Sequence, residues 1–423
     1  MRGRKQVTFD VDLDSTPSGR SKKKRTVDAE REIWSHNIPL LYDLFLSNDI
    51  RNNCLTIQWL PGFERCEDGY IMYRFTTGTY TGTKRNFLIV AGVRLTDLSE
   101  YERSPLVSER IEVQQKINHT GEVNRTCHIP QNPHIIATQS STAEILLFDC
   151  KKHPKRPRQT GVCKPDLRLR GHEKEGYGLS WNRRRSGHLL SSSDDCTVRL
   201  WDINAGPKTG CKYVEPLKTF TGHEEAVSDV SWHPFKGSIF GSVSDDKTIR
   251  MWDNRSRSAT NVIRGHSDAV TCLSFNWFCD YILATGSLDG SIGMWDLRNL
   301  QTPLYALERD LGPVFELHWS SLRETILGSC GESNKLYIWD VSKIGEEVSS
   351  EDGAPELLFI HNGHKSKVSD FSWSPDKPWL MCSLAEPGII QIWQVAKTVY
   401  AEDDDPVVCV RQPLSRKETS QLF

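Results

Sequence analysis

The stretch GHEKEGYGLSW at residues 171–181 recurs in related form three more times, and this repetition decides the fold. The sister copies are GHEEAVSDVSW (222–232), GHSDAVTCLSF (265–275) and GHKSKVSDFSW (363–373). Each copy places its histidine 29 residues before a tryptophan, as in His172 and Trp201. Four equal spacings indicate a tandem structural repeat.

Three further units are less regular. One begins at His119 and reaches Phe148 after the same 29 residues, and another ends in Trp339-Asp340 without a Gly-His pair. Strand-like segments that predict one more unit lie at 55–61, 70–80 and 87–95. Apolar alternation and turn residues predict four antiparallel strands in each unit. Because a lone blade of this kind cannot bury both faces, the units are expected to close into a ring. The sequence therefore predicts an all-β fold, a seven-bladed β-propeller.

The Gly-His to Trp-Asp unit resembles the WD-repeat family over roughly residues 55–395. Three repeats share a histidine, a serine, an aspartate and a tryptophan: His172, Ser193, Asp195 and Trp201; His223, Ser244, Asp246 and Trp252; and His266, Ser287, Asp289 and Trp295. The resemblance implies a structural hydrogen-bond chain in each blade, and recurrence in three blades disfavours a Ser-His-Asp catalytic triad. The twelve cysteines include no CxxC pair, which argues against a zinc ribbon or a dithiol redox site. We expect no enzymatic activity, no cofactor and no metal site.

The repeats divide the chain into a propeller and its flanking segments. We expect a disordered basic tail at 1–28, an N-terminal helix docked on the propeller at 29–50, the WD-repeat propeller at 51–396 with an insert loop at 345–358, and a C-terminal helix or tail at 397–423. The helix is expected because apolar residues recur at three- and four-residue spacings between Ile33 and Phe45. Pro39 is expected to kink it or to mark a helix start.

Charge and hydropathy restrict the location of the protein. No segment approaches 18 consecutive apolar residues, and the charged start MRGRKQVTFDVDLD lacks the apolar stretch of a secretory signal. We therefore expect an intracellular protein. A basic run predicts nuclear import through Lys22, Lys23, Lys24 and Arg25. The net charge of −2 lacks the broad basic surface of nucleic-acid-binding proteins, although contact between the basic loop 151–158 and DNA stays open.

The residues after each Gly-His pair are expected to face one mouth of the central channel. Side chains two apart on a strand point the same way, so the third and fifth positions after the histidine lie together. The third positions are Glu122, Glu175, Ala226, Ala269, Pro313 and Lys367, and the fifth are Asn124, Tyr177, Ser228, Thr271, Phe315 and Ser369. Two glutamates and two aromatic residues suit a Lys/Arg-rich peptide. A solvated channel mouth with incidental charges is the alternative.

Segments outside the generic repeat resemble the retinoblastoma-binding, MSI1-like histone-binding proteins. These segments include INHTGEVNRT, PDLRLRGHEKEGYGLSWN, WDVSKIGEE and PELLFIHNGH. The resemblance implies that the channel mouth grips the N-terminal tail of histone H3 through Glu122, Asn124, Glu175, Tyr177, Phe315 and Glu386. Ser228, Thr271 and Pro313 stand where family members usually have Glu, Asn and Glu, so this site is thinned.

The same resemblance implies a second site at the edge of the ring, where the family clamps the first helix of histone H4. It would fall to Leu41, Leu44 and Phe45 of the N-terminal helix and to Glu346, Glu347, Glu351, Asp352, Leu358, Phe359 and Ile360 of the insert. Apolar residues would form the floor and acids the rim of a helix-in-groove site. A helix simply docked on the propeller is the alternative. The shorter loop around Ala354-Pro355, and Asn52-Asn53-Cys54 in place of Trp-Pro-Ser, depart from the family pattern.

The function that follows is a nuclear subunit that binds histones H3 and H4. Such proteins act as chaperones or adaptors in chromatin assembly, acetyltransferase, deacetylase, remodelling and Polycomb complexes. A competing interpretation rests on WDNR (252–255) and WDLR (295–298), which resemble the WDxR element of cullin-4 ubiquitin ligase substrate receptors. Neither interpretation involves a membrane or sequence-specific nucleic acid.

Overall fold

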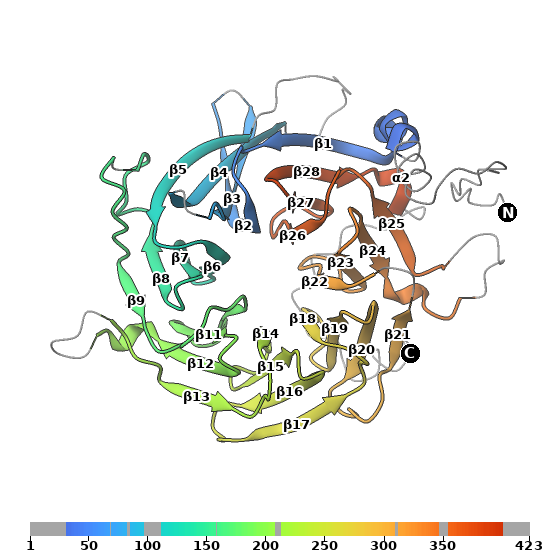
Figure 1. Cartoon of the computed structure of the whole chain (residues 1–423). Helices are drawn as coiled ribbons and strands as arrows, with labels where there is room; N and C mark the ends of the chain where they lie inside the picture. The colour runs from blue at the N-terminus through green and yellow to red at the C-terminus, as the bar shows by residue number, and fades with distance from the viewer. Residues whose placement is uncertain are drawn as a thin grey trace, which may run out of the picture.

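The computed structural model describes residues 31–67, 69–82, 85–96, 111–157, 159–207, 213–308, 312–346 and 354–400. Seven four-stranded antiparallel sheets surround one axis, and in six of them the strand that comes first in the chain is innermost (Figure 1). The predicted all-β, seven-bladed propeller is confirmed. Within the described ranges, no helix is long and apolar enough to cross a membrane.

The first three blades follow the chain from its N-terminal side. Blade 1 contains β2 (Cys54–Arg65), β3 (Tyr70–Thr79), β4 (Asn86–Thr96) and β5 (Ile111–His119). Blade 2 contains β6 (Val123–Ile129), β7 (Asn132–Ser140), β8 (Ile145–Asp149) and β9 (Leu167–Leu169). Blade 3 contains β10 (Leu179–Trp181), β11 (His188–Ser192), β12 (Thr197–Asp202) and β13 (Lys218–Thr221), with the short 3-10 helix η1 (Ile203–Ala205) after β12.

The remaining blades complete the ring. Blade 4 contains β14 (Val227–Trp232), β15 (Ile239–Ser244), β16 (Thr248–Asp253) and β17 (Ala259–Arg264). Blade 5 contains β18 (Val270–Phe275), β19 (Ile282–Ser287), β20 (Ser291–Asp296) and β21 (Tyr305–Glu308). Blade 6 contains β22 (Val314–Trp319), β23 (Ile326–Gly331), β24 (Leu336–Asp340), the 3-10 helix η2 (Val341–Lys343) and β25 (Leu357–His361). Blade 7 contains β26 (Val368–Trp373), β27 (Leu380–Ala385) and β28 (Ile389–Val395), and the short helix α2 (Lys397–Tyr400) follows it.

The N-terminal segment closes the ring, and this corrects the expected helix at 29–50. The helix occupies residues 31–41, includes Pro39 and ends two residues after it, and β1 (Tyr42–Asp49) then pairs with β28 as the outer strand of blade 7. From Leu44 onward the side chains alternate: Leu44 and Leu46 pack against one core cluster and Phe45 against another. Pairing with β28 overrides the helical spacing because it satisfies an otherwise open sheet edge.

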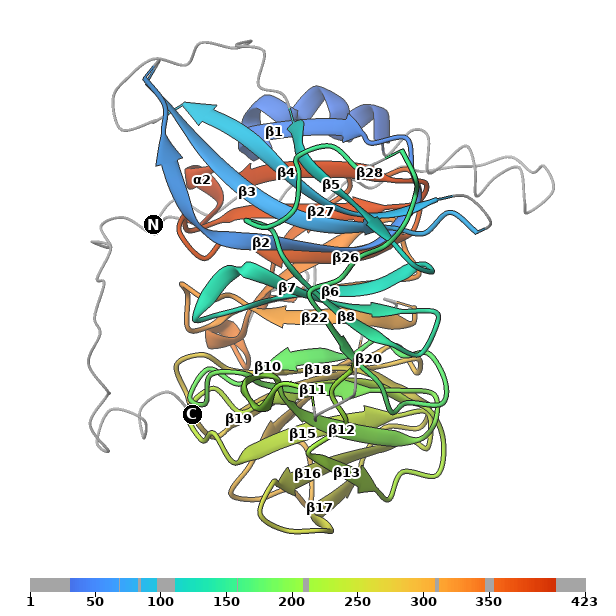
Figure 2. The same ribbon diagram turned by 90° about the vertical axis from the view of Figure 1, so that its left-hand side faces the viewer.

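The N-terminal helix lies beside the start of β1 at the rim of the ring (Figure 2). Its Trp34 is 8% exposed, donates from Nε1 to the Tyr42 hydroxyl at 3.1 Å and packs edge-on against Phe45. Burial of this large side chain between blades 6 and 7 anchors the helix. The described part of the expected insert loop ends at Glu346 and resumes at Ala354, and residues 401–423 lie outside the described chain.

Five tryptophans at matching repeat positions are fully buried between blades: Trp201, Trp252, Trp295 and Trp339, each followed by aspartate, and Trp393, which is followed by Gln394. In blade 3 the Trp201 indole donates to Ser191 Oγ at 2.8 Å, and the same hydroxyl contacts His172 Nε2 at 2.7 Å. His172 Nδ1 lies 2.8 Å from Asp195 Oδ2. Burial alone would raise the pKa of Asp195, but the hydrogen bond from His172 holds it well below its ordinary value. This buried chain supports the blade.

The serine in this chain differs from the predicted one. Ser191 takes the place expected of Ser193, and blades 4 and 5 use Ser242 and Thr285 in the same way. Ser193 follows the end of β11, where its hydroxyl donates to the Glu175 carbonyl and accepts from the Asp195 amide. Ser244 and Ser287 repeat that turn contact. Ser191 and Ser193 are two residues apart, and side chains two apart along an extended chain point the same way. The sequence alone therefore could not tell which serine bonds the histidine, because that depends on the pairing register of the strand.

Candidate functional site

Acidic and aromatic side chains converge at the end of the ring where β6 and β10 begin. We call this surface the acidic face, and it consists of Tyr80, Glu122, Asn124, Glu175, Tyr177, Asp194 and Glu386. Their proximity is recorded by Tyr80, whose pKa is raised chiefly by the charge of Glu122, then by burial and by Glu175, with Glu386 contributing. Glu122, Asn124, Glu175, Tyr177 and Glu386 were expected here from the sequence. Tyr80 and Asp194 were not.

Two loops of different blades hold Glu122. Its Oε1 accepts a hydrogen bond from the Gly82 amide of the β3–β4 turn at 2.7 Å, and its own amide donates to Ser141 Oγ at 3.1 Å. A carboxylate that accepts a backbone N–H is fixed in position and keeps further lone pairs for a ligand. Glu122 is therefore preorganised.

Asn124 links blade 2 to blade 3. Its side chain is buried, and Nδ2 donates to Glu175 Oε2 at 3.0 Å and to the Gly176 carbonyl at 3.2 Å. Among the described residues no group donates to its buried Oδ1. Because this oxygen is itself buried, the amide acts on the acidic face by orienting Glu175 rather than by contacting a ligand.

Tyr177 presents an exposed ring beside these carboxylates. Its side chain is 39% exposed, and burial of the hydroxyl together with the charge of Glu175 raises its pKa to about 12. Its carbonyl accepts from Arg125 Nε at 3.0 Å, which fixes the backbone at the ring. The tyrosine therefore stays protonated and can stack on a cation.

The glycines that flank Tyr177 serve packing within the ring. A Cβ at Gly176 would come within 2.0 Å of the Ser192 carbonyl, and one at Gly178 within 2.9 Å of Asp229 Cα on the next blade. The space beside each glycine is thus filled by backbone. This explains why the blade 3 copy departs from the valine of its sister repeats at Gly176.

Phe315 lies under a cation of the chain itself. Lys367 Nζ sits 4.2 Å from the centre of the Phe315 ring, so blade 7 covers an aromatic surface of blade 6. Such an arrangement is a cation–π contact. A cationic ligand would have to displace Lys367 to use this ring.

The three positions where the face was expected to be thinned make contacts of their own. Ser228 donates to Asp245 Oδ1 at 3.0 Å, Thr271 donates to the Val314 carbonyl at 2.5 Å, and the Pro313 carbonyl accepts from Glu332 N at 3.0 Å. Asp245 and Asp194 are the first aspartates of two Asp-Asp pairs whose second members bind the blade histidines. The doubled aspartate was the sequence signal for these extra carboxylates.

The expected edge site is divided between the core and the surface. Phe359 is 7% exposed and packs edge-on against Tyr42 at 5.4 Å, while Ile360 is 38% exposed. Phe359 was expected on an open floor beside Leu358 and Ile360, but alternation along β25 turns Phe359 into the core.

The other expected edge residues occupy different environments. Leu41, Phe45 and Leu358 pack partly buried against the cluster between blades 6 and 7, and Leu44 packs against that of blades 7 and 1. Glu346 is exposed, whereas Glu347, Glu351 and Asp352 lie outside the described residues. Leu40, which is 71% exposed, belongs to the edge surface although the sequence argument did not select it.

Two family models match parts of the chain. A family model for the histone-binding protein RBBP4, or the C subunit of the CAF1 complex, matches residues 29–97, which include the N-terminal helix and β1 to β4. A second model, the WD domain or G-beta repeat, matches residues 163–202, 214–253, 257–296 and 355–394. The chain is an MSI1-like WD-repeat protein of the histone-binding type.

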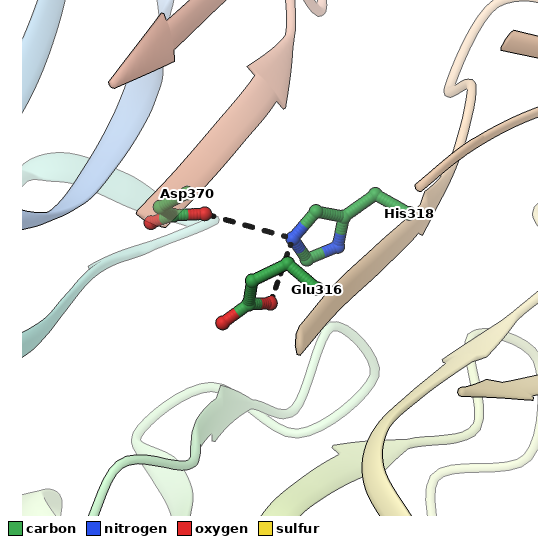
Figure 3. Close-up of side chains that lie close together, drawn as sticks. All are labelled: Glu316, His318 and Asp370. Carbon is green, nitrogen blue, oxygen red and sulfur yellow. Dashed lines mark ion pairs between the residues drawn. The ribbon is translucent and has the colours of Figure 1, made fainter. Parts of the chain in front are cut away.

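An ionic cluster lies on the inner strands of this MSI1-like propeller, with Asp370 buried and the His318 side chain 36% exposed. Arg125 contacts Glu316 Oε1 at 2.5 Å and Asp370 Oδ2 at 3.5 Å. His318 Nε2 lies 3.4 Å from Glu316 Oε2 and 4.0 Å from Asp370 Oδ1 (Figure 3). These side chains come from β6, β22 and β26 of three different blades. Burial raises the pKa of Asp370 to about 6 even though Arg125 opposes the shift. Arg125, Glu316 and Asp370 share the sixth position after the blade histidine or its equivalent. Sequence analysis missed the cluster because it compared only the third and fifth positions.

The cluster connects the inner strands with the acidic face. Glu316, His318 and Asp370 could in principle offer ligands to a metal ion, but the Arg125 guanidinium already lies against both carboxylates. The same guanidinium holds the Tyr177 carbonyl through Nε. In this MSI1-like protein the cluster therefore positions Tyr177.

The WDxR arginines of the repeats bind the aspartates of their own motifs. Arg255 Nε lies 2.9 Å from Asp253 Oδ1, and Arg298 Nε lies 2.9 Å from Asp296 Oδ1. Both arginine side chains are largely exposed. The pairing of each arginine with its own aspartate explains the WDxR motif without a partner protein. The guanidinium groups stay accessible to solvent.

Proposed function

We propose that this protein binds histones H3 and H4 and acts as an adaptor or chaperone in chromatin assembly and modification. The observation that carries the proposal is the acidic face, where Glu122, Glu175 and Tyr177 from two blades meet around Asn124. Membership in the histone-binding type supports it.

The chemistry of the acidic face selects its ligand. Fixed carboxylates accept charge-assisted hydrogen bonds from Lys and Arg side chains, and each such bond contributes roughly 1.5–3 kcal/mol. The Tyr177 ring offers a surface for a cation or an aliphatic stem. An extended, unmodified and basic peptide such as the H3 tail satisfies both requirements.

The edge of the ring is proposed as the place where a helix of H4 binds. Ile360 on β25 and Leu40 on the N-terminal helix are exposed apolar side chains, and the two elements touch through the Trp34 and His361 rings at 6.2 Å. The exposed Glu346 and the acidic residues of the insert would meet basic residues at the rim. Apolar contact would supply affinity and the acids would set orientation.

The nuclear location and the complexes remain part of the proposal. Residues 22–25 lie outside the described chain, and the run KKKR supports import as a local charge motif. Alanine at all four positions is expected to shift the protein toward the cytoplasm. Unchanged nuclear signal in the variant would refute this assignment.

A pull-down from nuclear extract, read by mass spectrometry, tests the proposed function. The tagged full chain is expected to retain histones H3 and H4, and Glu122→Gln/Glu175→Gln/Ile360→Asp is expected to retain far less of both. Recovery of a cullin-4 adaptor by both proteins, without histones, would favour the WDxR interpretation. Equal histone recovery by both would contradict the assigned surfaces.

A further inference from the structure

One turn at the opposite end of β10 from Glu175 and Tyr177 is unusually basic. The turn after β10 reads NRRR at 182–185, whereas the matching turns read HPFK (233–236), NWFC (276–279), SSLR (320–323) and SPDK (374–377). Glu175 precedes β10 and this turn follows it, so the two lie at opposite faces of the ring. The three arginines therefore belong to a surface separate from the acidic face.

The turn does not need the side chains of Arg184 and Arg185, whereas Arg183 lies over the Trp277 ring at 4.2 Å. Asn182 Oδ1 accepts from the amides of Arg184 at 2.9 Å and Arg185 at 2.8 Å, and this cap sets the turn. In blade 4, His233 Nδ1 caps the amides of Phe235 and Lys236 in the same way. The cap uses only backbone at 184 and 185, so their side chains are available for another purpose.

The arginines border a hollow of about 410 Å³ between blades 3 and 4, lined by Arg184, Arg185, Phe235, Gly237, Ser238 and Arg255. A Cβ at Gly237 would meet Arg184 Cβ at 2.9 Å, so glycine lets the arginine pack closely against blade 4. There Arg184 Nε donates to the Pro234 carbonyl at 3.3 Å. This contact holds the guanidinium at the hollow.

The hollow carries an excess of positive charge. Within the described part of the chain, Arg184 and Arg185 form no ion pair, while Arg255 pairs with Asp253 through Nε and Nη2. Phe235 is 37% exposed at the same place. Three guanidinium groups, one opposing carboxylate and an exposed ring thus line one concave surface.

We propose that this hollow binds an acidic peptide segment of a partner protein, with carboxylates on Arg184, Arg185 and Arg255 and an apolar side chain on Phe235. Arginine forks match carboxylates in pairs of parallel hydrogen bonds. A single-stranded nucleic acid would need a longer basic track with successive stacking rings, whereas here the charge is confined to one hollow on a chain of net charge −2. Basic and acidic partners would then bind opposite faces of one ring.

Fluorescence anisotropy of the full chain with a fluorescein-labelled peptide, Glu-Asp-Glu-Leu-Glu-Asp-Glu, tests the proposal. Arg184→Gln/Arg185→Gln is expected to weaken binding about 100-fold, since each charge-assisted contact is worth roughly a factor of ten. Lys155→Gln/Arg156→Gln removes the same charge from another exposed loop and is expected to change affinity less than threefold. Phe235→Ala should reduce the affinity for this peptide by a larger factor than it reduces the affinity for the same peptide with glycine in place of leucine.

Other results would overturn the proposal. The first is that the acidic peptide does not bind at low salt. The second is an equal loss of affinity in the two double variants, which would indicate general charge attraction. An oligothymidylate probe that binds more tightly than the peptide and is released by Arg184→Gln/Arg185→Gln would assign the hollow to nucleic acid instead. Because both arginines are exposed and the Asn182 cap is retained, thermal unfolding is expected to be unchanged in the variants.

Discussion

Asn124 Nδ2 donates to Glu175 Oε2 at 3.0 Å and joins the first inner strand of blade 2 to the loop before blade 3. The bond sets the direction of a carboxylate on the acidic face, and it leaves Asn124 Oδ1 without a donor among the described residues. The amide of Asn124 therefore acts on the acidic face by orienting this carboxylate. This pairing makes Asn124 a sensitive position for ligand binding.

Asn124→Ala is expected to weaken binding of an unmodified H3 tail peptide about tenfold, because it releases the Glu175 carboxylate from its fixed position. Calorimetric titration measures the change. Asn299→Ala, at an exposed turn after β20, is the matched control and should bind like the parent. An Asn124→Ala protein with parental affinity would show that ligand binding does not depend on this amide.

Arg125 is expected to govern both stability and the position of Tyr177. Arg125→Met leaves Glu316 and Asp370 without their cation in a buried site, which typically costs about 3–5 kcal/mol. Urea unfolding measures the loss. Adding Glu316→Gln and Asp370→Asn should recover much of the stability, whereas tail affinity should stay low because Tyr177 keeps no anchor. Recovery of both properties would argue against a positioning role.

Stability is expected to fall on acidification through pH 6.5 toward 4. Burial lowers the pKa of His119 to about 4 and that of His128 to about 4. The unfolded chain therefore binds more protons in this window, and the free energy of unfolding falls by up to about 1.4 kcal/mol per histidine for each unit by which the pH is lowered. Urea unfolding at several pH values gives the free energy of unfolding as a function of pH. We expect the slope of this function to be shallower for His119→Gln than for the parent. An unchanged slope would contradict the buried, neutral state of His119.

At the edge of the ring, two adjacent substitutions should separate folding from binding. Phe359→Asp buries a charge in the core between blades 6 and 7 and is expected to destabilise the protein by several kcal/mol. Ile360→Asp changes an exposed side chain and should leave the unfolding midpoint close to that of the parent while weakening an H4 helix peptide at least tenfold. Parental affinity of a folded Ile360→Asp protein would move the H4 site elsewhere.

The repeat spacing was sufficient to predict the ring because each His-Trp pair marks one blade, inside which the two side chains are buried. It could not predict that Tyr42–Asp49 is a strand, since its apolar spacing also fits a helix and only the open edge of β28 decides between them. The choice of Ser191 over Ser193 likewise depends on pairing register. Local sequence predicts that a strand or helix is present, whereas pairing with other strands decides between helix and strand at 42–49 and between Ser191 and Ser193.

The acidic face was largely predictable because repeat positions align around one axis. Glu122, Glu175 and Tyr177 meet there for this reason. The Arg125 cluster was missed although Arg125, Glu316 and Asp370 share the sixth position after the blade histidine or its equivalent, because only the third and fifth positions were compared. The role of Gly176 could not be predicted from the repeat, because it depends on the Ser192 carbonyl, which occupies the space where a side chain would lie.

The most direct test of the central claim is calorimetric titration of the full chain with an unmodified H3 tail peptide. Parent protein is compared with Glu122→Gln/Glu175→Gln, and Glu224→Gln/Glu225→Gln, at exposed positions after His223, serves as the control. We predict saturable binding by the parent and the control and at least 100-fold weaker binding by Glu122→Gln/Glu175→Gln, with an affinity that falls as salt is raised. Equal affinities in all three proteins, or no binding by the parent, would contradict a histone-tail site on the acidic face.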